Sequence, residues 1–310
     1  MIPAVSVIIP LYNKQRELPA AIRSLLSQSF ADWEAVIVDD GSTDGSVDVL
    51  RQFSDPRIRL VRQANAGVAA ARNRGIAEAR AELVAFLDAD DEWMPDYLES
   101  MIALARKYPE AVIYGSNYQF RGPKGDLSPT ILRRMPFNDG NGLLTNYFEV
   151  ASYSHPPLWT SAVMARREAL CRIGGFPVGV CSGEDLLTWA RLAMLGPVAY
   201  DMQPHAIYNL GEGYDFSNLP PRRQDSGDPV GQGLTQLLEQ HPDTYGLRDY
   251  LSHWHKMRAS VAIRYGERCE TLREACRSLR WSPRNRKVLP FLILPLLPTP
   301  LLRYIIQHHR

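Results

Sequence analysis

The first half of the chain alternates between short apolar runs and segments with helical periodicity. The runs occupy positions 5–10, 35–38, 58–61, 83–87 and 111–114 and are apolar except for Ser6 and Arg59. Apolar residues at helical spacing lie between them, for example Leu18, Ile22 and Leu25. Short continuous apolar runs are typical of strands buried on both faces, and strands that alternate with helices form right-handed β-α-β units. The pattern predicts an α/β fold: a doubly wound, mostly parallel sheet with flanking helices.

The strand predicted over 83–87 ends in three carboxylates, Asp88, Asp90 and Asp91. Carboxylates this close repel one another and are stable together mainly where a cation or water takes up their charge. The carboxyl ends of parallel strands are also where open α/β sheets bind ligands. The arrangement favours a Mg2+ or Mn2+ ion shared with the phosphates of a substrate. The alternative is an acidic surface turn that caps the helix predicted over 96–108.

A second acidic turn begins at Asp39, so two consecutive strands bring acids to the same edge of the sheet. Asp39 is suited to accept a hydrogen bond from the imide N–H of a base such as uracil; alternatively, it caps the next helix. Arg72 would bind a base or a phosphate as a bidentate donor, unless it lies on a solvated helix face. The sequence has no G-x-G-x-x-G or G-x-x-x-x-G-K-[ST] motif, which disfavours dinucleotide oxidoreductases and P-loop enzymes.

Four segments resemble, in order and spacing, the motifs of family 2 glycosyltransferases with the GT-A fold. They are VSVIIPLYN at 5–13, VDDGSTD at 38–44, NAGVAAARN at 65–73 and FLDADD at 86–91. The resemblance extends over about residues 4–210. It implies a nucleotide-diphospho-sugar donor and a Mn2+ or Mg2+ cofactor. In that family the acid that matches Asp39 contacts the nucleobase, usually uracil, and the arginine that matches Arg72 helps to hold it.

The resemblance also implies the remaining residues of the site. Pro10, Tyr12 and Asn13, at the end of the first strand and on its loop, belong to the donor nucleotide site. Asp88 binds the ribose and the metal-diphosphate, and Asp90 is the direct metal ligand.

An acidic pair, Glu184 and Asp185, follows a Gly-Gly-Phe sequence at 174–176. By itself the pair indicates N-terminal charge that complements the dipole of the next helix. In the family, however, the second acid at this point is the catalytic base. The resemblance therefore implies Asp185 as the base, with Glu184 orienting Asp185 or the acceptor.

These parts predict an inverting transfer of a sugar. Asp185 would take the proton of an acceptor hydroxyl, whose oxygen attacks the anomeric carbon from the face opposite the diphosphate. We expect a saccharide or lipid-linked acceptor, as in the assembly of bacterial surface polysaccharides or glycolipids. Processive relatives carry Gln-x-x-Arg-Trp, which Arg280 and Trp281 match only weakly, so single addition is favoured.

Two other classes of protein remain open. A nucleotidyltransferase would usually show a glycine-rich, basic loop after the first strand, where this chain has only Lys14. A non-catalytic scaffold that binds sugar nucleotides is the second. The presence of all the acids implied for the site argues against a scaffold.

The pattern changes after position 210. We predict a glycosyltransferase domain over 1–210, a linker or mobile loop over 211–233 that could act as a lid, and a helical extension over 234–310. His253 and His255, at i and i+2, do not share a helix face, which disfavours a metal site between them.

Residues 288–306 are mostly apolar, are interrupted by four prolines and have basic residues on both sides. The prolines disfavour a spanning helix. An apolar segment with basic flanks is typical of one that lies in the interface of an anionic membrane. A tail folded onto the domain or onto a partner subunit is the alternative.

The charges are distributed unevenly along the 310 residues. Residues 277–310 hold seven Lys or Arg and no Asp or Glu, and the remainder has 28 basic against 34 acidic residues. An acidic body argues against a nucleic-acid groove. Four cysteines without metal-ligand spacing and an N-terminus without a signal-peptide pattern favour the cytoplasm. With the apolar tail, they predict a peripheral protein on the inner face of the cell membrane.

Overall fold

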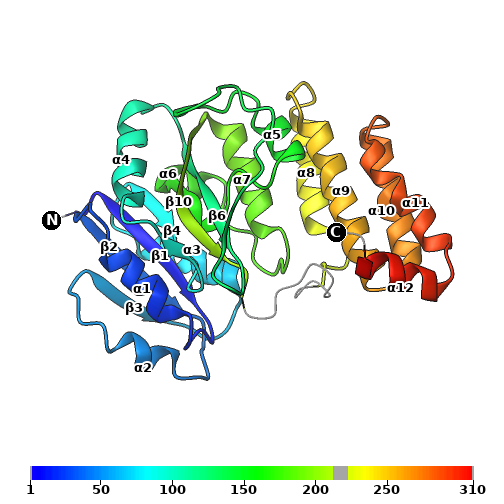
Figure 1. Cartoon of the computed structure of the whole chain (residues 1–310). Helices are drawn as coiled ribbons and strands as arrows, with labels where there is room; N and C mark the ends of the chain where they lie inside the picture. The colour runs from blue at the N-terminus through cyan, green and yellow to red at the C-terminus, as the bar shows by residue number, and fades with distance from the viewer. Residues whose placement is uncertain (1, 212–222, 309–310) are drawn as a thin grey trace.

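The computed structural model describes residues 2–211 and 223–308. Its centre is a ten-stranded sheet, with helices α8 to α12 gathered beside it (Figure 1). The strands are β1 Val5–Leu11, β2 Trp33–Asp39, β3 Ile58–Arg62, β4 Leu83–Phe86, β5 Glu92–Trp93, β6 Ile113–Arg121, β7 Leu127–Pro129, β8 Asn141–Leu143, β9 Val163–Arg166 and β10 Val198–Asn209. The helices of this part are α1 Leu18–Leu26, α2 Ser46–Leu50, α3 Val68–Glu78, α4 Tyr97–Lys107, α5 Tyr147–Tyr153, α6 Arg167–Arg172 and α7 Glu184–Leu195.

Strand β1 is apolar except for Ser6 because both of its faces are buried. Its side chains alternate between two buried clusters: Ile8 packs on the α3 side of the sheet, and Val7 and Ile9 pack on the α1 and α4 side. A methyl group added to Gly75 of α3 would lie 2.4 Å from Cγ2 of Ile8, so α3 lies directly on the strand. The α/β fold predicted from the apolar runs is confirmed.

The strand order is β3-β2-β1-β4-β9-β6-β10-β5, with β7 beside β6 and β8 beside β10. The half from β3 to β4 is parallel, as predicted. The other half is mixed, because β9 runs antiparallel to both β4 and β6. Directly before β9, the chain forms a 3-10 helix over Thr160–Ala162.

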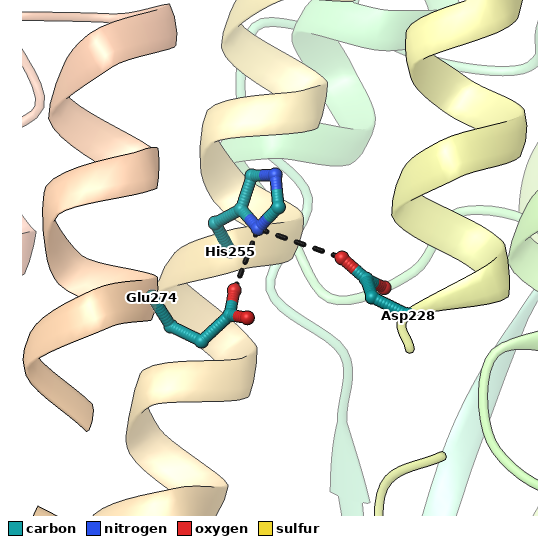
Figure 2. Close-up of side chains that lie close together, drawn as sticks. All are labelled: Asp228, His255 and Glu274. Atoms are coloured by element: carbon teal, nitrogen blue, oxygen red, sulfur yellow. Dashed lines mark hydrogen bonds and ion pairs between the residues drawn. The ribbon is translucent and has the colours of Figure 1, made fainter. Parts of the chain in front are cut away.

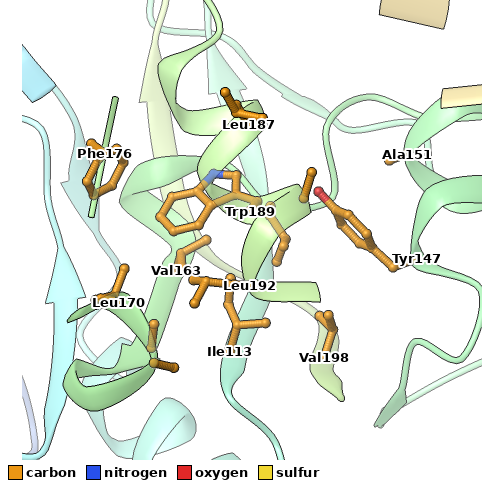
Figure 3. Packing of buried hydrophobic residues seen from close by; sticks show 14 of the residues in the cluster. Ile113, Tyr147, Ala151, Val163, Leu170, Phe176, Leu187, Trp189, Leu192 and Val198 are labelled. Carbon is orange, nitrogen blue, oxygen red and sulfur yellow. The ribbon is translucent and has the colours of Figure 1, made fainter. Parts of the chain in front are cut away.

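The largest buried cluster surrounds Trp189 of α7 (Figure 3). The Trp189 ring lies 5.9 Å from the ring of Phe86 and 5.4 Å from that of Phe176. The same cluster continues through Leu187 into the apolar side chains of α8 and α9. The helical extension therefore shares its core with the sheet.

The extension consists of α8 Pro229–Gln240, α9 Leu247–Arg264, α10 Arg268–Trp281, α11 Pro290–Ile293 and α12 Thr299–His308, with 3-10 turns at Arg286–Val288 and Leu294–Leu296. Helix α8 begins inside the segment predicted as a linker, which corrects that segment's C-terminal limit. Residues 212–222 of the same segment, and with them most of the suggested lid, lie outside the described residues.

The apolar tail is packed onto the protein in part and exposed in part. Val288 is buried against Ala259 of α9 and Ala275 of α10. Five other large apolar side chains are exposed: Leu289, Ile293, Leu296, Leu301 and Tyr304. Within residues 2–211 and 223–308, no helix is both long enough and apolar enough to cross a bilayer.

Candidate functional site

The loops after β1 and β2 are tied together at the edge of the sheet. Asn13, with a left-handed φ of 50°, accepts hydrogen bonds through Oδ1 from the N–H groups of Thr43 at 2.8 Å and Asp44 at 3.3 Å. Pro10 pairs in register with Val38 of β2, and Tyr12 is exposed on the loop. Three residues predicted for the donor site thus form one side of this edge.

Asp39 is completely buried at the end of β2. Its Oδ1 accepts from the N–H of Ser42 at 3.0 Å and its Oδ2 from Nε of Arg62 at 3.1 Å. The next residue, Asp40, accepts from the N–H groups of Ala66 and Gly67 at 2.9 and 2.8 Å. Asp40 therefore shapes the loop that leads into α3. The sequence alone does not show that the two neighbouring aspartates have different partners.

Arg72 is buried, with 3% of its surface exposed, so the solvated helix face considered for it is wrong. Its Nη2 donates to both carboxylate oxygens of Asp88, at 2.9 and 3.1 Å, and its Nη1 donates to Oε1 of Glu184 at 3.1 Å. Burial lowers the pKa of Arg72, but the charges of Asp88 and Glu184 outweigh burial and hold it above its ordinary value. One guanidinium therefore joins the end of β4 to the start of α7.

The three carboxylates after β4 have separate partners. Asp88 pairs with Arg72, whereas Asp90 lies 2.7 Å from Nζ of Lys14 and keeps 39% of its side chain exposed. Asp91 is buried and accepts from Oγ of Ser161 at 2.6 Å. Burial, together with the charges of Asp90 and Asp88, raises the pKa of Asp91 well above its ordinary value. The repulsion expected among the three carboxylates is thus relieved in two ways. Arg72 and Lys14 each pair with one carboxylate, and the third, Asp91, is buried and hydrogen-bonded.

Two observations bear on the acidic turn considered as an alternative. The residue before α4 is Asp96, and its side chain makes no capping hydrogen bond. Asp91 faces Ser161 in the interior instead of water. The carboxylates after β4 therefore do not form a solvated cap of α4.

Among the carboxylates after β4, Asp90 is the most accessible to a divalent cation. It is the most exposed of the three, and its partner Lys14 sits on a flexible stem. Carboxylate oxygen is a ligand that Mg2+ and Mn2+ prefer. Both oxygens of Asp88 face Arg72, so Asp88 adjoins this position with its charge already paired.

A second group of possible ligands lies between the C-terminal helices. One ligand atom each of Asp228, His255 and Glu274 lies within 4.8 Å of the others (Figure 2). The guanidinium of Arg258 already lies 3.5 Å from Oδ1 of Asp228 and 3.3 Å from Oε1 of Glu274. We interpret this group as an ion-pair network, because a cation there would face Arg258 across the same carboxylates.

The acidic pair begins helix α7. Glu184 is buried against Arg72. Asp185 accepts through Oδ1 from the N–H of Leu186 at 2.8 Å and through Oδ2 from Oγ1 of Thr160 at 3.4 Å. Burial raises the pKa of Asp185, and the positive charge of Arg72 opposes that effect. A carboxylate with a raised pKa is more basic than a solvated one, which is what the base predicted at this position requires.

Two bacterial relatives match part of the chain. A putative teichuronic acid biosynthesis glycosyltransferase, TuaG of Bacillus subtilis, is 46% identical over 103 residues, which are 32% of this chain and 41% of that protein. The Escherichia coli protein named UDP-Glc:alpha-D-GlcNAc-diphosphoundecaprenol beta-1,3-glucosyltransferase WfgD is 40% identical over 116 residues, 37% of this chain and 46% of that protein. The chain thus spans less than half the length of these two relatives.

Solved structures match nearly the whole chain. Staphylococcus aureus TarS in complex with UDP-GlcNAc superposes over 99% of this chain and 88% of its own, with a TM-score of 0.66 and 18% identity. The mannosyltransferase PcManGT of Pyrobaculum calidifontis, in complex with GDP-Man and Mn2+, covers 99% and 87%, with a TM-score of 0.59 and 18% identity. At this identity the similarity shows the fold, which is GT-A.

The family model "Glycosyl transferase family 2" matches residues 6–171, which is more than half of the chain. The match contains β2, β3 and β4, all of β1 except Val5, and the Asp-x-Asp after β4. The resemblance drawn from the four sequence motifs is therefore confirmed. The chain belongs to glycosyl transferase family 2.

Proposed function

We propose that this protein is an inverting glycosyltransferase that moves a sugar from a nucleotide-diphospho-sugar to an acceptor hydroxyl. The observation that carries the proposal is the buried Arg72, which bonds Asp88 of the Asp-x-Asp and Glu184 of the acidic pair at the same time. A donor bound at Asp88 and Asp90 would therefore lie near Asp185.

The nucleoside end of the donor is assigned to the loops after β1 and β2. Asp39 would accept the imide N–H of uracil, with Pro10, Tyr12 and Asn13 beside it. Because Asp39 already holds Ser42 and Arg62, base binding requires the exposed Arg62 to release Oδ2. The UDP-sugar named for WfgD and the UDP-GlcNAc bound by TarS favour a UDP-sugar as donor.

The diphosphate is assigned to Asp90, with Asp88 beside it and Mn2+ or Mg2+ between protein and donor. The bound ion would neutralise charge on the leaving diphosphate. Lys14 would move from Asp90 to the donor phosphates, since one carboxylate would not hold both cations. The Mn2+ in PcManGT is consistent with this assignment.

The chemical step is assigned to the acidic pair. Asp185 would accept the proton of the acceptor hydroxyl as its oxygen attacks the anomeric carbon, with Glu184 fixed by Arg72 to orient Asp185 or the acceptor. A single displacement from the face opposite the diphosphate inverts the anomeric configuration. Arg72 keeps Glu184 paired, so the proton goes to the less constrained carboxylate.

Calorimetric titration of UDP with and without Mn2+ tests the donor and metal sites. We expect Mn2+ to tighten UDP binding at least about tenfold in the wild type, which corresponds to ~1.4 kcal/mol. Asp90→Asn should lose that gain, because an amide oxygen is a weaker ligand than a carboxylate. Asp48→Asn, an exposed change on α2, is the matched control and should keep it. A full Mn2+ gain in Asp90→Asn would contradict the assignment of Asp90.

For the acceptor we propose a saccharide, free or linked to a lipid, in the assembly of surface polysaccharide or glycolipid. The names of TuaG and WfgD, one in teichuronic acid biosynthesis and one with a diphosphoundecaprenol acceptor, support this choice. Nucleic acid is not expected as a partner.

A membrane contact through 288–310 would bring the enzyme to such an acceptor. Exposed Ile293 and Leu296, at 61% and 73%, lie on the tail, and the exposed Arg284, Arg286 and Lys287 precede them in the chain. Exposed apolar side chains in a segment that also carries exposed basic residues suit the interface of an anionic membrane. We propose a peripheral position on the cytoplasmic face of the cell membrane.

Co-sedimentation with vesicles tests the contact. The wild type is expected to sediment with phosphatidylglycerol vesicles and much less with phosphatidylcholine, and binding should weaken in high salt. Ile293→Asp combined with Leu296→Asp should release most of the protein. Leu127→Asp, an equally drastic change at an exposed position of β7, should not. If the double variant and the control sediment alike, the tail is not the contact.

A further inference from the structure

The acidic pair follows a glycine that the C-terminal helices hold in place. Gly183, just before α7, has a φ of 82°, a left-handed conformation that favours glycine. A methyl group added to Gly183 would lie 2.6 Å from Cη2 and 2.7 Å from Cζ3 of Trp254 on α9. The indole therefore lies against the backbone directly before Glu184 and Asp185.

The orientation of Trp254 is fixed by Asp228. Trp254 is 4% exposed, and its Nε1 donates to Oδ1 of Asp228 at 2.9 Å. Asp228 has a φ of 54° and is itself constrained, because the same Oδ1 accepts from the N–H of Gly231 at 3.0 Å and so caps α8. A buried indole with its N–H bonded in this way has one preferred orientation.

A second contact supports the same loop. Oδ2 of Asp225 accepts from the N–H groups of Cys181 at 2.9 Å and Ser182 at 3.2 Å. The carbonyl oxygen of Asp225 lies 3.4 Å from both terminal nitrogens of Arg258. The two residues before Gly183 are thus contacted by the segment before α8 and, through it, by α9.

Behind these contacts lies the ion-pair network of Figure 2, which joins α9 to α10. Glu274 is fully buried; its Oε2 lies 2.6 Å from Nδ1 of His255, and its Oε1 accepts from Arg277 at 2.7 Å. Arg258 lies between Glu274 and Asp228. Removing one partner of such a buried network lowers the stability of the fold strongly. The network therefore holds α9 and α10, and with them Trp254, in a fixed position.

We propose that Trp254 and Asp228 are positioning residues for the acidic pair: Asp228 holds Trp254, Trp254 holds the left-handed Gly183, and Gly183 sets the direction in which α7 presents Asp185. The inference rests on the proposed function, in which Asp185 is the base. By this inference the C-terminal helices help to position the catalytic base. They do so through Gly183, which lies 45 residues before Asp228 in the chain.

Kinetics of nucleotide release from a UDP-sugar test the inference, with UDP affinity measured in parallel. We expect Trp254→Leu and Asp228→Ala each to lower kcat at least tenfold and to shift the acid limb of the pH profile, while the affinity for UDP changes less than twofold. Asp228→Asn keeps Oδ1 as an acceptor for both N–H groups and should recover most of the rate. Trp281→Leu, which truncates a partly buried tryptophan on α10, is the matched control and should leave kcat and the pH profile unchanged.

A double variant tests whether Trp254 acts through Gly183. Gly183→Ala should be strongly impaired, because the methyl group meets the indole; adding Trp254→Leu removes that clash, so the double variant should lose less than the product of the single losses. Wild-type kcat and pH profile in folded Asp228→Ala, or losses that simply multiply, would overturn the positioning role. Absence of UDP binding and release in the wild type would instead overturn the proposed function.

Discussion

Replacement of Asp185 by asparagine is expected to slow sugar transfer by about 10²–10⁴-fold and to leave the affinity for UDP unchanged. Asparagine keeps the shape of the side chain and an oxygen that can accept from the N–H of Leu186, so the local structure should persist. It cannot accept the proton of the acceptor hydroxyl. Initial rates of transfer and calorimetric titration of UDP measure the two quantities separately.

The same variant tests the pH dependence. Burial raises the pKa of Asp185 above the ordinary 3.8 of an aspartate, and a base works only when deprotonated. The wild-type rate should therefore fall as the pH drops through this raised pKa, at a pH above that of a solvated aspartate. Asp185→Asn should lose this acid limb, whereas Asp48→Asn should keep both rate and limb. A variant with more than a tenth of the wild-type rate would contradict the assignment of Asp185 as the base.

The second large effect concerns stability. Arg72→Met should lower the free energy of unfolding by about 3–5 kcal/mol, because it leaves the carboxylates of Asp88 and Glu184 without their shared cation. Arg72→Lys should lose less, since it keeps the charge but not the planar fork that reaches both acids. Urea unfolding followed by circular dichroism measures the change.

Arg74→Met is the matched control for this prediction. Arg74 lies on the same helix and pairs with Glu78 at 2.9 Å, but about half of its side chain is exposed. Exposed pairs contribute little, so this variant should unfold close to the wild type. Equal losses in the two variants would show that Arg72 does not carry the buried pairing described for it.

The sequence was most informative where a single rule decides the structure. Runs of apolar residues predicted β1, β2 and β4, because both faces of these strands are covered. It failed at β10, which contains Asp201, Pro204 and His205 and shifts register twice against β6. The irregular pairing of β10 with β6 accommodates these polar residues and the proline. The spacing of apolar residues in the sequence gives no sign of such pairing.

For the site, the sequence located the acids but not their partners. Asp88, Asp90 and Asp91 are the same residue type within four positions, and only the tertiary structure separates a guanidinium partner, an ammonium partner and a buried serine partner. The pairing of Arg72 with Glu184 joins residues 112 positions apart. Such contacts depend on how α3 and α7 pack, which local patterns do not contain.

The tail shows a further limit. Its prolines divide residues 288–306 into short pieces, so no single period tells which side chains face inward. Val288 and Leu302 are buried, whereas Leu289 and Leu301 beside them are exposed. Some apolar residues of the tail therefore pack on the protein and others lie on its surface. From the composition alone, these had been two alternatives.

The measurement that tests the central claim most directly is the release of nucleotide from a panel of UDP-, GDP- and dTDP-sugars with Mn2+ or Mg2+, first alone and then with lipid-linked saccharide acceptors. The account predicts release of UDP from one UDP-sugar, abolished by EDTA and in Asp185→Asn. Binding of a sugar nucleotide without release under any of these conditions would contradict a transferase and favour a scaffold. Folded protein that binds no sugar nucleotide at all would contradict the donor site itself.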